Sequence, residues 1–193
     1  MIYLSFDIEE FDMPKEYGFD IPFERQMSIS REGLIAILDL LKKHEAKATF
    51  FSTVVFAQNA PDLIERLLGE GHELGSHTYY HSDFAIEHLL SSKEALETEF
   101  GVTIEGLRMP RMLEVAATDV KQAGYLYNSS INPTFLPGRY NKLHVSRSMF
   151  CEEGLWQIPA GVSPWRIPLF WLSFHNFPLW YYKHLLSRTV GSL

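Results

Sequence analysis

GHELGSHTYYHS, residues 71–82, contains two histidines four positions apart, His77 and His81. A helical turn between them would place both imidazoles on one face, with the side chains about 5–6 Å apart. Imidazole is a favoured ligand of zinc and of neighbouring divalent metals. Two histidines leave a coordination shell incomplete, so this pair predicts a metal site that takes a carboxylate from elsewhere in the chain.

The carboxylates that suit this site lie near the start of the chain, in the stretch FDIEE, residues 6–10. Residues two apart on a strand point the same way, so Asp7 and Glu9 are expected to face one cavity. Metal-assisted hydrolysis needs one carboxylate as a ligand and another as a base for water. A solvated acidic loop is the competing interpretation, and the apolar segment 2–6 that leads into the cluster weakens it. Glu10 is expected to be a bystander.

Hydrophobic patterning predicts an α/β fold, because apolar strand segments alternate with amphipathic helical segments, as in a parallel sheet of βαβ units. The segment 11–27 is expected to be a loop, and 131–154 and 163–178 have no clear periodicity. A buried first strand is expected at 2–6, and the next helix is expected to begin at Ser28 or Ser30. Further strands are expected at 48–52, 72–76, 104–108, 125–129 and 155–160, and helices at about 28–44, 61–69, 91–100, 118–123 and 179–188.

The polar residues named above follow predicted strands, and sites in parallel α/β folds lie at the carboxyl ends of strands. Arg108 is a further candidate of this kind. It precedes Met109-Pro110, and a residue before proline is held extended. An arginine at such a strand end would pair with a carboxylate and keep it ionised. The strand ends together therefore predict one shared site.

Composition limits the classes of function. With 193 residues, 46% of them hydrophobic, the chain is expected to form one domain over 1–193. A net charge of −7 argues against nucleic acid as a partner. No apolar run approaches the ~20 residues that cross a bilayer, and no charged leader precedes the first strand, so a cytoplasmic location is expected. Cys151 is the single cysteine, which excludes an internal disulfide. These features leave the oligomeric state open.

Five segments together resemble the polysaccharide deacetylase family, which shares the NodB homology domain. They occur in the family's order: FDIE (6–9), GHELGSHTYYH (71–81), GLRMP (106–110), GYLYNSS (124–130) and QIP (157–159). The resemblance implies a distorted, incomplete (β/α)7-type barrel. It also implies a hydrolase that removes N-acetyl groups from a sugar or polysaccharide, with assembly of cell-envelope polysaccharide as a setting.

The resemblance also assigns roles by position. Asp7 takes the place of the catalytic base, and Arg108 that of the arginine that orients it. The metal ligands are expected to be Glu9, His77 and His81. Zinc is the expected metal, with cobalt or another divalent ion as alternatives. The substrate groove is expected to be lined by Tyr127, Ser129, Ile158 and Pro159, and by Trp171 from an aromatic-rich segment that otherwise packs in the core.

Three departures from the family pattern matter. The first motif lacks the usual Asp-Asp pair, so the ligand is placed at Glu9. Asn128 stands where an aspartate is usual, which removes a charge. No late strand carries the family's histidine for the general acid. Either His175 is that acid, or the last strand with its histidine lies beyond this sequence; the second alternative is favoured because a closing strand should follow the helix expected at 179–188.

Three functions compete. A metal-dependent deacetylase that acts on an N-acetylated saccharide is favoured. A related amide hydrolase that acts on a small or cyclic amide would use the same metal site. The third is a glycan-binding module with little or no turnover, which the neutral Asn128 and the undecided acid favour.

Overall fold

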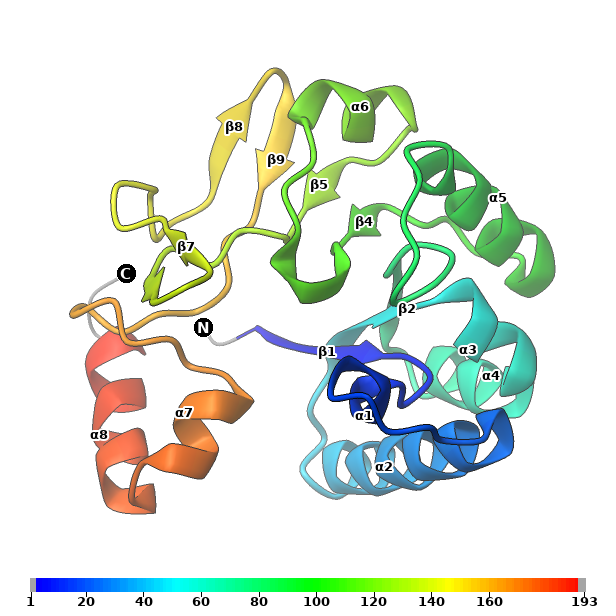
Figure 1. The fold of residues 1–193 in the computed structure, drawn as a ribbon, viewed down its shortest axis with the longest axis horizontal. Helices are drawn as coiled ribbons and strands as arrows, with labels where there is room; N and C mark the ends of the chain where they lie inside the picture. The colour runs from blue at the N-terminus through cyan, green and yellow to red at the C-terminus, as the bar shows by residue number, and fades with distance from the viewer. Residues whose placement is uncertain (1–2, 191–193) are drawn as a thin grey trace.

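The computed structural model describes residues 3–190. Its centre is a seven-stranded sheet in the order β1-β2-β3-β4-β5-β9-β8, parallel except for β8 (Figure 1). The α/β class predicted from the sequence is confirmed. The strands of this sheet are β1 (Leu4–Ile8), β2 (Ala48–Ser52), β3 (Glu73–Ser76), β4 (Gly106–Leu107), β5 (Tyr127–Asn128), β9 (Leu155–Gln157) and β8 (Phe150–Glu152), and a separate hairpin pairs β6 (Phe135–Leu136) with β7 (Tyr140–Asn141).

Helices surround this sheet. In Figure 1, α1 to α4 gather beside β1 and β2, α6 lies beside β5 and β9, and α7 and α8 form a pair at the opposite end. No helix within residues 3–190 has both the length and the apolar character needed to cross a membrane. The helices are α1 (Met13–Glu16), α2 (Phe23–Lys43), α3 (Val54–Asn59), α4 (Pro61–Gly69), α5 (His88–Phe100), α6 (Ala117–Gln122), α7 (Trp171–Asn176) and α8 (Leu179–Val190), with a 3-10 turn η1 (Pro110–Met112) after β4.

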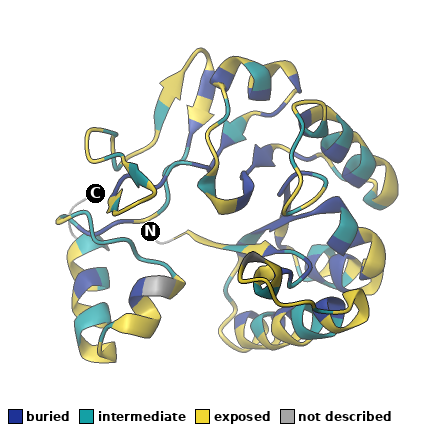
Figure 2. Ribbon diagram, in the orientation of Figure 1, coloured by how far each residue is buried: buried dark blue, intermediate teal, exposed yellow. Residues whose placement is uncertain are grey.

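The two faces of the sheet differ in what they contact. Phe50, Leu74 and Leu107 lie on the helix-covered face, where they are buried in the main core (Figure 2). Each such side chain stabilises the fold by about 1.5–3 kcal/mol. Alternate residues point to the other side of a strand, so Asp7 and its register partner Phe51 lie on the opposite face. We call this second face the site face.

Helix α2 shows both the strength and the limit of the sequence pattern. The expected stripe is confirmed, because Leu34, Leu38 and Leu41 are all buried. The predicted start at Ser28 or Ser30 is wrong, since the helix begins at Phe23, directly after Pro22. The side-chain amide of Gln26 donates to the carbonyl of Ile21 (2.9 Å), and this contact helps to fix the earlier start.

The expectation for the first strand needs correction. The first strand is not buried throughout: β1 is an edge strand, Tyr3 is 83% exposed and Leu4 is 39% exposed, and Ile2 lies outside the described residues. The incomplete barrel that the resemblance implies agrees with the structure, because the sheet stays open within residues 3–190, where β1 and β8 each have one neighbour. Helices α1, α3 and α7 and strand β8 were not predicted, since segments of three to six residues are too short for periodicity to be read.

Candidate metal centre

Three parallel strands bring the predicted polar residues together at the carboxyl ends of the strands. Asp7 lies in β1 and Glu9 follows that strand, His77 follows β3, and Arg108 follows β4. The register pairs Asp7 with Phe51 and Ser76 with Leu107, so these strand ends are level with one another. Residues far apart in the sequence therefore meet at one place, as predicted.

His77 is held by the backbone of the next strand. Its side chain is buried, and Nδ1 lies 2.7 Å from the carbonyl oxygen of Arg108. A carbonyl can only accept, so Nδ1 carries the proton and Nε2 presents a lone pair. Nε2 lies 3.1 Å from Oε2 of Glu9. Burial disfavours a charged imidazole, but the negative charges of Asp7 and Glu9 outweigh burial and raise the pKa of His77. The electrostatic potential at this side chain is therefore negative, which favours a cation.

His81 is held in the same manner by a carboxylate. Its Nδ1 lies 2.7 Å from Oδ1 of Asp12, and its Nε2 lies 3.3 Å from Oε2 of Glu9. Asp12 is buried, and its second oxygen accepts a hydrogen bond from the hydroxyl of Ser82. Burial favours the neutral acid, but hydrogen bonds from Ser82 and His81 lower the pKa of Asp12 and keep it ionised. An ionised Asp12 fixes the proton of His81 on Nδ1.

The segment between the two histidines is not the helical turn that the spacing predicted. Thr78 has a left-handed backbone (φ 64°), which is unusual for a β-branched residue. The turn is fixed by amide groups at the start of α3, because Val54 and Val55 donate to the carbonyls of Thr78 and Tyr79. The two imidazole rings still stack with centroids 5.9 Å apart, so the histidines meet by a different backbone route.

The donor set fits a divalent cation. The ligand atoms of Glu9, His77 and His81 all lie within 4.8 Å of one another. Oε2 of Glu9 is buried and has no hydrogen-bond partner among residues 3–190. With both imidazole protons on Nδ1, three lone pairs face one another and no hydrogen lies between them. Two imidazoles and one carboxylate are a common set for catalytic zinc, so the residues present fit a divalent metal site, as the sequence predicts.

Asp7 and Arg108 form the second half of the site. The guanidinium Nη1 of Arg108 lies 2.9 Å from Oδ1 of Asp7, and its Cζ lies 4.3 Å from the ring centroid of Phe51. Partial desolvation favours the neutral form of Asp7, but the charge of Arg108 outweighs it and lowers the pKa of that carboxyl. The Asp7 side chain is 36% exposed, so an ionised carboxylate faces solvent beside the histidine pair.

Sequence reasoning missed two carboxylates that support the ligands. Asp12 lies in the segment 11–27, which the sequence predicts as a loop, and its distance in sequence from His81 gives no signal of their contact. Glu10, expected to be a bystander, is buried and joins two segments of the site. It accepts from the hydroxyl of Thr53 (2.8 Å) and from the amide of His81 (3.4 Å). Both residues therefore position the turn that carries His81.

The remaining predicted residues divide into two groups. Ser129 contacts the site directly, because its carbonyl and hydroxyl both accept from Arg108. The hydroxyl of Tyr127 donates to Glu73 on the site face, and Ile158 and Pro159 are half-buried just after β9. Trp171 and His175 lie on α7, where His175 has ring contacts to Trp171 and Phe174 of its own helix. Their parts in binding or proton donation stay predictions.

Comparison with known proteins gives the same family from independent evidence. The family profile described as "Polysaccharide deacetylase" matches residues 1–127. A peptidoglycan-N-acetylmuramic acid deacetylase, PdaA of Bacillus subtilis, is 34% identical over 99 residues, which cover 46% of this chain and 38% of the relative. A peptidoglycan-N-acetylglucosamine deacetylase of Bacillus cereus is 47% identical over 49 residues, or 25% of this chain and 18% of the relative. The matched parts are thus well under half of these relatives.

Two solved structures share the fold at low sequence identity. One is a protein of Mycobacterium smegmatis that has been assigned as a polysaccharide deacetylase. The two structures superpose with a TM-score of 0.62 at 21% sequence identity, over 82% of this chain and 58% of the other. The other is a PuuE allantoinase, with a TM-score of 0.57 and 20% identity, covering 83% and 61%. At this level of identity the likeness supports the fold alone.

Proposed function

The chain belongs to the polysaccharide deacetylase family, and on this premise we propose that it is a metal-dependent hydrolase that removes N-acetyl groups from an N-acetylated saccharide. The relatives named above act on peptidoglycan amino sugars, and others are named chitooligosaccharide deacetylases. The observation that carries the proposal is the meeting of Glu9, His77 and His81 beside an exposed, arginine-paired Asp7.

Glu9, His77 and His81 would hold the metal, for which we propose zinc because of the donor set. When bound, the ion supplies Lewis-acid polarisation of the acetyl carbonyl and acidifies water. The hydrogen bonds from Nδ1 of His77 and His81 to Arg108 and Asp12 keep both Nε2 atoms unprotonated and aimed at the ion.

Asp7 is the proposed general base. The charge of Arg108 lowers its pKa, and its carboxylate is accessible beside the histidine pair. It is therefore ionised and placed to take a proton from the attacking water. Arg108 fixes the carboxylate by donating from Nη1, and is itself fixed by the carbonyl of Ser129. The proton returned to the leaving amine needs a separate donor, and His175 is the candidate that this chain offers.

The test measures metal content and acetate release from a chitooligosaccharide in the same samples. Glu9→Ala and His77→Ala are expected to lose both the metal and the activity. Asp7→Asn is expected to keep the metal and to lose about 10²–10⁴-fold in turnover. His44→Ala, at an exposed histidine beyond α2, is the matched control and should change neither quantity.

Two outcomes would contradict the proposal. Acetate release that survives in His77→Ala without metal would show that the cluster is not catalytic. Binding of metal and of the saccharide without acetate release would select the glycan-binding alternative. His175→Ala tests the proton donor separately: a fall in turnover without a change in metal content would assign the role to His175, and unchanged turnover would leave it to a histidine beyond this sequence.

A further inference from the structure

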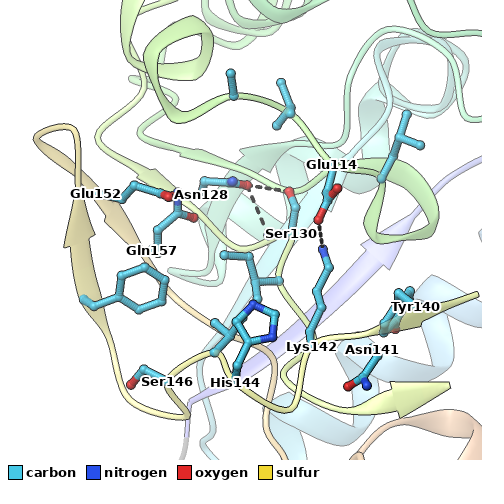
Figure 3. Close-up of a pocket in the computed structure, with 16 residues that line it drawn as sticks. Glu114, Asn128, Ser130, Tyr140, Asn141, Lys142, His144, Ser146, Glu152 and Gln157 are labelled. Carbon is cyan, nitrogen blue, oxygen red and sulfur yellow. Dashed lines mark hydrogen bonds and ion pairs between the residues drawn. The ribbon is translucent and has the colours of Figure 1, made fainter.

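A cavity of about 740 Å³ opens beside β5 and β9, outside the metal centre. Figure 3 shows Asn128, Gln157 and Glu152 gathered on one side of it, with Lys142 and His144 projecting from the segment that joins β7 to β8. Its volume is in the range of small-molecule sites, ~300–1,000 Å³.

This cavity lies on the opposite side of the sheet from the metal centre. Asn128 and Gln157 are register partners, and their side chains line the cavity. The preceding pair in register, Tyr127 and Trp156, must face the other way. Tyr127 does so, because its ring packs against Phe51 on the site face. A ligand in this cavity would therefore be separated from Asp7 by the sheet itself.

The floor of the cavity presents an unsatisfied acceptor. Gln157 is 1% exposed, and its amide nitrogen donates to Glu152 (2.8 Å), which orients the amide. Its Oε1 has no hydrogen-bond partner in the part of the chain that the structure describes. An unpaired buried acceptor is costly and is stabilised by any donor that reaches it. Beside Gln157, the side-chain oxygen Oδ1 of Asn128 accepts hydrogen bonds from both the amide and the hydroxyl of Ser130. This oxygen is therefore occupied, and the NH₂ group of Asn128 remains as a donor. An acceptor next to a donor matches a hydroxyl or acetamido group, which both donates and accepts.

The walls favour a neutral ligand. Lys142 is paired with Glu114 (2.9 Å), as Figure 3 shows, so its charge is already compensated. Glu152 adds a negative charge at the floor, which opposes an anion. Phe150 and Tyr140 supply aromatic surface against which the apolar side of a sugar ring packs.

We propose that this cavity is a second carbohydrate site, which binds a neutral, hydroxyl-rich or acetamido-bearing sugar unit away from the metal centre. The choice of a saccharide among neutral polar ligands rests on the proposed function. The site would hold a saccharide chain at the protein without taking part in hydrolysis.

The experiment is an NMR titration of the ¹⁵N-labelled full chain with di-N-acetylchitobiose. Asp7→Asn is used as the background so that the probe is not consumed. We expect shift changes at the amides of Asn128, Ser130 and Gln157. Phe150→Ala and Gln157→Met are expected to weaken binding at these amides about tenfold or more, with an otherwise unchanged spectrum as proof of folding.

Cys151→Ser is the matched control, because Cys151 is exposed and adjacent to Phe150 but pairs in register with Trp156 on the other face. It should bind as the parent does. Shift changes confined to the surroundings of Glu9 and Arg108, or none at all, would overturn the cavity site. Cavity shifts in this titration, together with no acetate release by the unsubstituted protein, would overturn the proposed function alone, so the two failures are distinguishable.

Discussion

Oδ1 of Asp12 lies 2.7 Å from Nδ1 of His81, in a pair where both side chains are at most 9% exposed. The contact joins the segment after β1 to the turn after β3, and it leaves Nε2 of His81 directed at Glu9. Carboxylates that orient a ligating imidazole also raise its basicity. The metal centre therefore depends on a residue that does not belong to the donor set.

We predict that Asp12→Asn weakens metal binding about 10–100-fold, which is typical for loss of such a partner. The neutral amide has both an oxygen and an NH₂ group, so it no longer holds the proton of His81 on Nδ1. Competition of the protein with a chromogenic chelator measures this affinity directly, without reference to turnover.

Asp83→Asn is the control for that variant, since Asp83 is exposed and lies next to Ser82. Equal metal affinity in Asp12→Asn and Asp83→Asn would mean that the Asp12–His81 hydrogen bond has no role in ligand positioning.

Thr53 connects the fold to the site, and its hydroxyl has two partners. It accepts from the amide of Phe56 as the N-cap of α3 (3.1 Å) and donates to Oε2 of Glu10 (2.8 Å). Thr53→Val removes both contacts and leaves a buried carboxylate oxygen unpaired. We expect a loss of about 2–3 kcal/mol in the free energy of unfolding. Thr53→Ser keeps the hydroxyl and should lose less than about 1 kcal/mol in urea unfolding; an equal loss in both variants would mean that the two hydrogen bonds of the hydroxyl are not the cause.

The fold was largely readable from the sequence because its main elements have clean periodicity. Leu34, Leu38 and Leu41 mark one face of α2, and the run ATFFS marks β2. Boundaries were less accurate where tertiary contacts set them. Strands β4 and β5 pair over two residues each, and α2 gained its first turn from the contact of Gln26 with Ile21. Such contacts leave no local pattern in the sequence.

The meeting of the predicted residues could be read from the sequence, but the contacts that support them could not. Glu9, His77 and Arg108 follow strands, so a parallel sheet necessarily brings them together. Asp12 and Glu10 act through contacts to residues about 70 positions away. No spacing rule connects such positions, and a run of acidic residues is ordinarily a solvated loop.

Gly106 and Gly33 form a matched pair for testing how tightly the site face is packed. A Cβ on Gly106 would collide with the ring of Tyr127, whereas one on Gly33, in α2, would meet open space. Gly106→Ala must displace Tyr127 from its hydrogen bond to Glu73, and we expect about 1–3 kcal/mol of destabilisation. Gly33→Ala should instead stabilise the protein by about 0.5–1 kcal/mol. Urea unfolding of both variants gives the comparison, and a stabilising Gly106→Ala would refute the packing of Tyr127 against that strand.

Glu97 gives a prediction in which the sign of a pH effect is determined. Burial raises the pKa of this carboxyl, but the hydrogen bonds from Lys93 (2.6 Å) and from the amide of Ile104 (2.9 Å) outweigh burial, and the pKa is lowered. A carboxyl with a lowered folded-state pKa stabilises the protein above its unfolded pKa, and this contribution is lost as pH falls through the folded value. Glu97→Gln should therefore lower the free energy of unfolding by about 1 kcal/mol at neutral pH, and this difference from the parent should shrink below about pH 4.

Glu94→Gln, at an exposed position of the same helix, is the control, and its difference from the parent in urea unfolding should not change with pH across this range. A Glu97→Gln deficit that stays constant down to pH 3 would mean that the lost charge is not its cause.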